Sequence, residues 1–390
     1  MIPISYNWRS LLVRKTTTIA SALGIGLVVF VLASSQMLAN GIERTMKLSG
    51  SVDKAFVIRK GSDNELSSSI ETRLVGIALA GPGVKSNAGG NPMGAPEIMV
   101  VLTLTRVGGS GSDVSNVQLR GVTPASLEIR PELRVIEGRP AKPGTDEVVV
   151  GRRIIGEFKG VQLGQSFEIK KNRKVQVVGV FEAGGSSFES EIWADIDTVR
   201  SAFGREGMVS SITVALDSAS KLETYKAAIE SDKQLNLQVE TEQGYFERQS
   251  ENTAGLVRYL GIAIVVFFSV GAMIGAMITM YGAVAGRSRE VGTLRALGFS
   301  RFHILTSFLL ESLMLAIVGG VLGGVAALSM GAVEFSMMNM QTFSEVVFSF
   351  DPNPQILLFS IAMGGLMGIL GGFLPAVRAA RTSPIDAMRE

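Results

Sequence analysis

The chain has 390 residues, a net charge of +2 and only 18% charged residues, and its mean hydropathy is +0.33. Residues 41–255 hold 54 charged side chains among 215, close to the quarter that is typical of soluble domains, whereas the other 175 residues hold 18. This distribution excludes a uniformly soluble enzyme, and the absence of cysteine together with a single histidine, His303, excludes disulfides, a thiol nucleophile, and cysteine or histidine metal clusters.

The N-terminal part predicts a membrane anchor preceded by an interfacial helix. Trp8 and neighbouring leucines alternate with basic residues over 1–15, which is typical of a short cytoplasmic helix on a membrane surface. Residues 16–42 carry no charge and are long enough to cross a bilayer. The apolar stretch exceeds a signal-peptide core, so we expect a retained transmembrane helix with a polar helical stalk, together spanning 16–49.

Residues 50–242 predict an α/β domain. Strand and helix patterns alternate at both ends, and we expect a β-α-β half at each end with a β-rich insertion at about 115–200. A hairpin is expected from 98–107 and 114–122. The later helix is expected to open at the Ser220-x-x-Glu223 capping pattern. The Gly/Pro-rich segment 81–96 predicts an exposed loop, either a flexible connection or a partner contact.

The exterior domain offers no clear catalytic motif. No segment fits G-x-x-x-x-G-K-[ST], so nucleotide chemistry is expected on another chain. Four acidic residues between 189 and 197 allow an acid/base or calcium interpretation. They alternate with Ile192 and Trp193 at a strand-to-helix junction, and we favour a solvated edge and a helix N-cap. The four are Glu189, Glu191, Asp195 and Asp197.

Three further spans follow the domain. We expect a stalk and second transmembrane helix at 243–286, a third at 302–333 and a fourth at 355–377, separated by a cytoplasmic segment at 287–301 and a periplasmic loop at 334–354. Basic residues cluster before the first span, in 287–301 and in the tail 378–390, whereas 334–354 has none. The positive-inside rule therefore places both termini in the cytoplasm. The basic excess lies beside apolar runs and does not indicate nucleic-acid binding.

The 287–301 segment and the helices after it contain the candidate site residues. Apolar residues recur at helical spacing, which predicts a short amphipathic helix ended by Gly298, equally typical of a helix lying on lipid. Glu311 is expected at the cytoplasmic interface, capping or pairing with this segment rather than relaying protons, because the charge-free run after it spans about 33 Å. Glycines at four-residue spacing predict close helix packing within one subunit, or a dimer seam: Gly319, Gly320, Gly323, Gly324, Gly364 and Gly368.

These motifs resemble a known family. REVGTLRALGF at 289–299 and ESLMLAIVGGVLGG at 311–324 are similar to the permease signature of the MacB/FtsX/LolCE superfamily of ABC transporters. The tail 375–389 is similar to the C-terminal signature of that superfamily. The pieces EGR at 137–139 and EVVVG at 147–151 resemble its membrane-distal domain. The matches occur in the family's order across nearly the whole chain.

The resemblance implies an α-helical membrane protein with four transmembrane helices and a large α/β periplasmic domain, in the bacterial inner membrane. It implies a dimer with a second permease copy or paralogue, and cytoplasmic ABC ATPase subunits that bind the ATP and Mg, with no cofactor or metal on this chain and no catalytic residue. The helix at 289–298 would be the coupling helix that contacts the ATPase, through Arg289, Glu290, Thr293, Leu294, Arg295, Leu297 and Gly298.

The function implied is mechanotransmission, in which ATPase motion reaches the periplasmic domain and exports an amphiphilic, peptide or lipoprotein cargo. A membrane-fusion protein or a lipoprotein carrier in the periplasm would be the further partner. The alternatives are lipoprotein extraction in the LolCE manner, or signalling to a periplasmic partner in the FtsX manner. The chain lacks the fused nucleotide-binding domain of MacB, and its exterior domain is larger than is usual for FtsX.

Overall fold

The computed structural model describes residues 8, 11, 13, 15–108 and 113–382. Most of the expected interfacial helix over 1–15, the turn of the expected hairpin and the tail from residue 383 lie outside these residues. The chain divides into two compact units. A helical unit comprises 1–40, 255–333 and 350–390, and a soluble unit comprises 41–254 and 334–349.

The helical unit is built from four long helices and one short helix. Among the described residues, four helices are long and apolar enough to cross a membrane, and each coincides with one of the charge-free runs. They are α2 (Lys15–Lys47), α7 (Glu242–Ala285), α9 (Arg301–Leu328) and α10 (Pro354–Arg381). The short helix α8 (Ser288–Ala296) follows α7. Helix α10 extends to Arg381, so the first residues of the expected tail at 378–390 are helical instead.

Glycines allow the helices of this unit to approach closely. A Cβ atom at Gly319 or Gly323 of α9 would collide with the backbone of α2 at Ala22 or Gly26. Gly320 and Gly324 contact the side chain of Ile361 on α10. Gly364 faces α2, and Gly368 faces α9. The glycines thus pack helices of one chain against each other, where lipid provides no hydrophobic drive between them.

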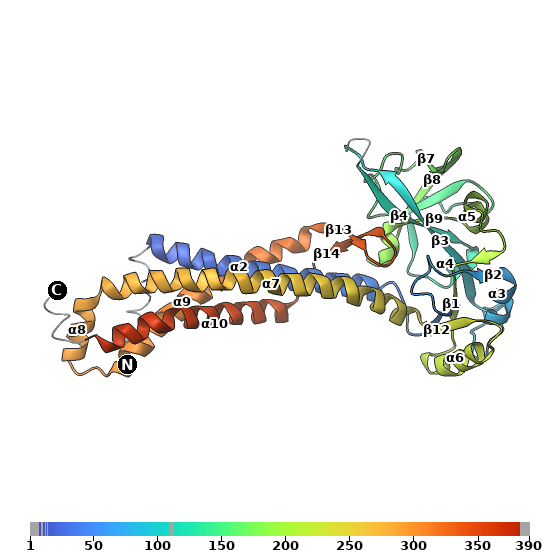
Figure 1. Ribbon diagram of the computed structural model, residues 1–390. Helices are drawn as coiled ribbons and strands as arrows, with labels where there is room; N and C mark the ends of the chain where they lie inside the picture. Colours follow the sequence, from blue (N-terminus) through green and yellow to red (C-terminus); the bar gives the residue numbers. More distant parts are fainter. Residues whose placement is uncertain (1–7, 9–10, 12, 14, 109–112, 383–390) are drawn as a thin grey trace. The chain divides into compact units, whose positions relative to one another are not determined.

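The soluble unit contains one ten-stranded sheet in the order β12-β1-β11-β3-β4-β9-β6-β8-β5, with β7 beside β8. The strands are β1 (Lys54–Arg59), β3 (Gly94–Thr105), β4 (Val114–Val122), β5 (Arg134–Gly138), β6 (Glu147–Gly151), β7 (Ser166–Lys170), β8 (Arg173–Glu182), β9 (Glu191–Asp195), β11 (Ser211–Ala215) and β12 (Leu237–Thr241). Strand β1 pairs with both β11 and β12 in antiparallel fashion, although these strands are far apart in sequence (Figure 1). Strands β4–β9 continue the same sheet rather than forming a separate one.

Short helices follow the strands of this sheet. They are α3 (Thr72–Leu79), α4 (Pro124–Glu128), α5 (Ile196–Phe203) and α6 (Leu222–Ser231). Strand β2 (Ile70–Glu71), directly before α3, pairs with β10 (Met208–Val209), which follows α5, in a separate two-stranded sheet. Val57, Val100, Val148 and Ile212 lie in one core cluster with residues of these helices, such as Leu74 and Tyr225. Alternating strand residues on both ends of the sheet therefore share one core.

Three local expectations are wrong. The Ser220-x-x-Glu223 pattern does not cap α6, because Lys221 precedes the helix without a side-chain cap and the Ser220 hydroxyl bonds Ser218. The segment 81–96 is not wholly a loop, since its last three residues begin strand β3. The segment 334–354 is not a plain loop, since it contains the hairpin of β13 (Glu334–Asn339) and β14 (Ser344–Ser349).

The β13–β14 hairpin belongs to the soluble unit although it connects two helices of the helical unit. Val347 lies in the domain core, and its N–H donates to Ser190 Oγ over 3.0 Å. Gln118 Nε2 on β4 donates to Ser344 Oγ over 2.7 Å, and Glu345 pairs with Arg106. The soluble unit is thus joined to the rest of the chain at α2, at α7 and at this hairpin.

Candidate coupling and transmission sites

Helix α8 is anchored to the helical unit along one face. Val291 is buried in a cluster with residues of three other helices, including Val284 of α7, Phe308 of α9 and Ala379 of α10. The helix ends at Ala296, and Gly298 follows with a φ of +97°, a conformation that glycine adopts without strain. Helix α8 is therefore in side-chain contact with α7, α9 and α10.

The other face of α8 is accessible. Leu297, the residue that follows the helix, is 72% exposed. Leu294 and Arg295 are half-buried, and Leu294 packs against the cluster around Val291. The remaining residues expected at an ATPase contact are exposed: Arg289, Glu290, Thr293 and Gly298. The site thus combines exposed charged residues with the exposed apolar residues Ala296 and Leu297, while the opposite face of α8 packs against other helices.

A buried ion pair fixes the turn between α7 and α8. The two terminal guanidinium nitrogens of Arg287, Nη1 and Nη2, donate to Glu311 on α9 over 3.0 Å and 2.8 Å. Arg287 is 7% exposed and Glu311 is 3% exposed. The planar guanidinium and carboxylate meet in a two-point geometry that resists rotation. Glu311, expected to cap or pair with the 287–301 segment, therefore contacts the residue directly before α8.

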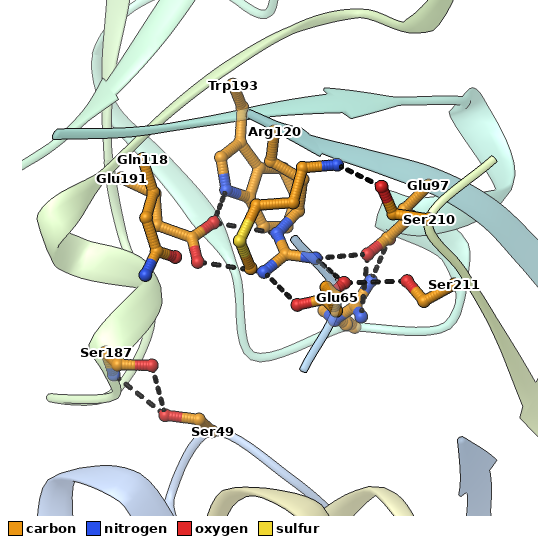
Figure 2. Close-up of polar contacts among 12 residues, drawn as sticks. Ser49, Glu65, Glu97, Gln118, Arg120, Ser187, Glu191, Trp193, Ser210 and Ser211 are labelled. Carbon is orange, nitrogen blue, oxygen red and sulfur yellow. Dashed lines mark hydrogen bonds and ion pairs between the residues drawn. The ribbon is translucent and has the colours of Figure 1, made fainter. Parts of the chain in front are cut away.

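A second cluster of charges lies inside the soluble unit, around Arg120 on β4 (Figure 2). Its guanidinium donates to both oxygens of Glu191 over 2.8 Å and 2.9 Å, and to both oxygens of Glu65 over 2.7 Å and 3.0 Å. A further bond of 3.0 Å reaches Glu97. Arg120 is 1% exposed and the three carboxylates are exposed by 2% or less. Three strands and the loop before β2 are joined at one side chain.

Arg130 extends this cluster to the first residue of α7. It donates to Glu97 and, over 3.1 Å, to Glu242, with which α7 begins. The ammonium of Lys54 lies 3.7 Å from Glu242. Strand β12 ends at Thr241, so α7 starts without any linker. We call the set Lys54, Glu65, Glu97, Arg120, Arg130, Glu191 and Glu242 the charge network.

The electrostatics of the charge network differ between its members. Burial raises the pKa of Glu191 and of Glu242 above the usual value despite the neighbouring cations. Burial opposes the ionisation of Glu97, but Arg130 and Arg120 outweigh burial and hold its pKa below the usual range. Burial likewise opposes the charge on Arg120, but Glu191, Glu65 and Glu97 raise its pKa well above the usual value. Hydrogen bonds from Arg120 and Arg130 to the carboxylates join these elements in one geometry, and removal of one member would leave others unpaired.

Helix α2 meets the soluble domain through a serine pair. Ser49, just beyond α2, lies 2.8 Å from Ser187 through their hydroxyl oxygens, and its hydroxyl also accepts the Ser187 N–H over 2.8 Å (Figure 2). The next residue, Gly50, lies directly against the backbone of Gln243, and a Cβ there would collide with it. The ends of α2 and α7 that belong to the soluble unit are thus both fixed to it.

Two of the four acidic residues between 189 and 197 differ from expectation. Asp195 does cap α5, accepting from the N–H groups of Asp197 and Thr198. Glu189 and Glu191 are not a solvated edge, since they are 0% and 2% exposed and pair with Arg152 and Arg120. No sequence motif singled out Arg120 or Arg130. The available signal was a charged residue within an apolar strand pattern, at Glu97 and Arg120, on neighbouring strands.

Comparison with known proteins identifies both parts of the chain. The family of MacB-like periplasmic core domains matches residues 16–232, and the family of FtsX-like permease C-terminal domains matches residues 262–384. The uncharacterized ABC transporter permease YknZ of Bacillus subtilis is 30% identical over 231 residues, covering 55% of this chain and 54% of YknZ. The macrolide export ATP-binding/permease protein MacB of Rhodospirillum rubrum is 32% identical over 233 residues, covering 57% and 34%.

Solved structures give similar matches for the soluble part. The extracellular domain of YknZ from Gram-positive bacteria is 17% identical with a TM-score of 0.37, covering 48% of this chain and all of that domain. The periplasmic region of MacB from Actinobacillus actinomycetemcomitans is 15% identical with a TM-score of 0.37, covering 52% and 94%. The chain aligns with about half the length of the curated YknZ relative and about a third of the MacB relatives. With a MacB-like core domain over more than half its length and an FtsX-like domain after it, this chain belongs to the MacB/FtsX-type family of ABC transporter permeases.

Proposed function

We propose that this chain is the permease subunit of an ABC transporter that works by mechanotransmission. ATP binding and hydrolysis take place on separate cytoplasmic ATPase subunits, and the permease has no catalytic residue of its own. The motion reaches the soluble domain on the periplasmic side, which acts on an amphiphilic, peptide or lipoprotein cargo. A second copy or a paralogue completes the dimer, and both termini face the cytoplasm of a bacterial cell.

The observation that carries this proposal is the construction of α8. A helix that only rested on lipid would need an apolar face toward the membrane and nothing more. Helix α8 instead buries Val291 against three membrane helices, and the residue before it is fixed to α9 by the Arg287–Glu311 pair. A partner that binds the exposed residues Glu290 and Leu297 could therefore displace the membrane helices against which α8 packs.

The route from α8 to the soluble domain supports the same proposal. Helix α7 runs from Glu242 to Ala285, so one element begins in the charge network and ends just before α8. Along its membrane part the described residues show few ionisable groups, so we infer that cargo is handled by the soluble domain rather than carried among the helices. Rotation or tilt of α7 would act on the network at Glu242.

The coupling is tested by reversing the charge of Glu290. We expect Glu290→Lys to abolish most co-purification of the ATPase and most of its stimulation. The change is at an exposed position, where an ion pair contributes at most about 1 kcal/mol, so the chain should remain folded. Glu206→Lys, an equal charge change at an exposed position of the soluble unit, is the matched control. If ATPase association and stimulation both survive Glu290→Lys, α8 is a lipid-surface helix and the proposal fails.

The orientation is tested with single cysteines, because the chain has none of its own. Lys171 is exposed in the β7–β8 turn, and Leu297 is exposed at the end of α8. In intact spheroplasts an impermeant maleimide should label a cysteine at 171 and should label one at 297 only after lysis. Labelling of the cysteine at 297 before lysis would show that the chain has the opposite orientation in the membrane.

A further inference from the structure

The soluble unit contains an apolar cavity that the transport mechanism above does not use. Its volume is about 210 Å³. It lies between the start of α4, strand β5 with the loop that follows, and the strands β6 and β9. The lining residues are Val122, Thr123, Pro124, Leu127, Leu133, Val135, Pro140, Ala141, Pro143, Val149, Trp193, Ala194 and Asp195.

The lining determines which chemistry the cavity accepts. Apolar residues provide most of its lining, and three prolines in the wall have no N–H to donate. A polar ligand would lose its hydrogen bonds to water there without regaining them. An apolar cavity of about 150 Å³ accepts benzene. This cavity therefore has room for an aromatic or branched aliphatic group somewhat larger than benzene.

One charged side chain gives the cavity a preference for the charge of its ligand. Among the lining residues, all of which the structure describes, Asp195 alone is ionisable. Its Oδ2 accepts from the N–H of Asp197 over 3.1 Å and of Thr198 over 3.3 Å, which fixes the carboxylate in place. A fixed negative charge beside the cavity disfavours anions and favours a cationic or neutral polar end.

Trp193 lies between the cavity and the charge network. It lines the cavity floor but is 0% exposed. Its Nε1 donates to Glu191 over 2.8 Å (Figure 2). The Arg130 guanidinium carbon lies 5.8 Å from its ring centroid. A group that filled the cavity would thus be one side chain away from Arg130, which contacts Glu242 at the start of α7.

We propose that this cavity binds a small amphiphile whose aromatic or branched apolar body enters it and whose neutral or cationic end stays near Asp195. Binding itself is independent of the transport function. The proposed consequence is that a bound ligand shifts Trp193 and Arg130 and thereby affects α7. This consequence rests on the proposed mechanotransmission. The two parts are therefore measured separately.

The first experiment uses Trp193 as the reporter. The chain has two tryptophans, so the full-length Trp8→Phe variant leaves Trp193 alone. Three brominated probes share one ring and differ in charge: 4-bromobenzylamine, 4-bromobenzyl alcohol and 4-bromophenylacetate. We expect saturable quenching of Trp193 fluorescence by the first two, and binding of the anion at least about fivefold weaker than that of the amine.

A filled cavity is the control. Ala141 lies in the loop that follows β5 and is half-buried, so Ala141→Phe should place a ring in the cavity without disturbing the sheet. In that variant we expect at least about tenfold weaker binding, whereas Ala228→Phe on the exposed face of α6 should bind like the parent. Circular dichroism verifies that each variant is folded. Linear quenching that Ala141→Phe leaves unchanged would show partition into lipid only and would overturn the site, as would tighter binding of the anion.

The second experiment tests the consequence. ATP hydrolysis by the assembled complex is measured with and without 4-bromobenzylamine, in the parent and in Ala141→Phe. A change of about twofold or more in the parent that disappears in Ala141→Phe supports the connection through Trp193. Saturable binding without any change in hydrolysis would retain the site and remove the connection. A full-length Glu290→Lys chain that no longer stimulates the ATPase, yet binds the probe like the parent, separates failure of coupling from failure of binding.

Discussion

Arg120→Ala should destabilise the soluble domain by about 3–5 kcal/mol, the usual cost of removing one partner from a buried ion pair. The change leaves Glu65, Glu97 and Glu191 close together, buried and without their shared cation. Chemical unfolding of the purified full-length chain, followed by circular dichroism, measures the loss. Arg134→Ala, at an exposed position on β5, is the matched control and should change the free energy of unfolding by less than about 0.5 kcal/mol.

The stability deficit of the same variant should depend on pH. In the parent, the pKa of Glu97 is below its usual value of 4.5, so its stabilising contribution is present above that pH and is lost as the pH falls through the lowered value. Without Arg120 the buried carboxylates bind protons more readily in the folded state than in the unfolded state. The deficit of Arg120→Ala should therefore shrink when the pH is lowered from 7 to 5. A deficit that is equal at both values would mean that lost packing, rather than unpaired charge, causes it.

Flexible insertions at the bases of α2 and α7 should separate ATP hydrolysis from motion of the soluble domain. Strand β12 passes directly into α7 between Thr241 and Glu242, and α2 is followed by the Ser49–Ser187 contact. About six Gly/Ser residues after Ser49, and the same after Thr241, would replace these rigid junctions with random coil. We expect hydrolysis to continue, because α8 and its support are unchanged, and nucleotide-dependent movement of the domain to be lost.

Hydrogen exchange of the assembled complex, with and without ATP, gives a readout that needs no knowledge of the cargo. In the parent, amides of β12 and the neighbouring β1 should change their exchange rate with nucleotide. In the doubly inserted chain these changes should vanish, whereas the same insertion after Lys171, in an exposed turn, should preserve them. Nucleotide-dependent changes that persist with both insertions would show that the helices are not the route. The β13–β14 hairpin, the third connection to the domain, would then be examined by an insertion after Val333.

Much of this protein follows from local sequence patterns, because such patterns depend on neighbours only a few residues apart. The four apolar helices are set by the length of charge-free runs, and the end of α8 by Gly298. Glycines recur at four-residue spacing in α9 and α10, which predicts close helix packing. The sequence left open which helices would pack against them. The signatures at 289–299 and 311–324 predicted the family that the comparisons identify.

Tertiary structure alone decided the partners of the charges. Arg120 meets carboxylates from residues 65, 97 and 191, and no local pattern specifies which strands lie side by side in a ten-stranded sheet. Glu191 resembled a solvated residue because polar residues alternate in its segment, yet both faces of β9 are covered. The 334–354 segment was expected to be a loop, since an isolated two-stranded hairpin is at best marginally stable in water. Contacts with β4 and with Ser190, which are distant in sequence, stabilise the hairpin here. Long-range pairing therefore created the charge network, the docked hairpin and the cavity above Trp193, whereas short-range patterning determined the membrane helices and α8.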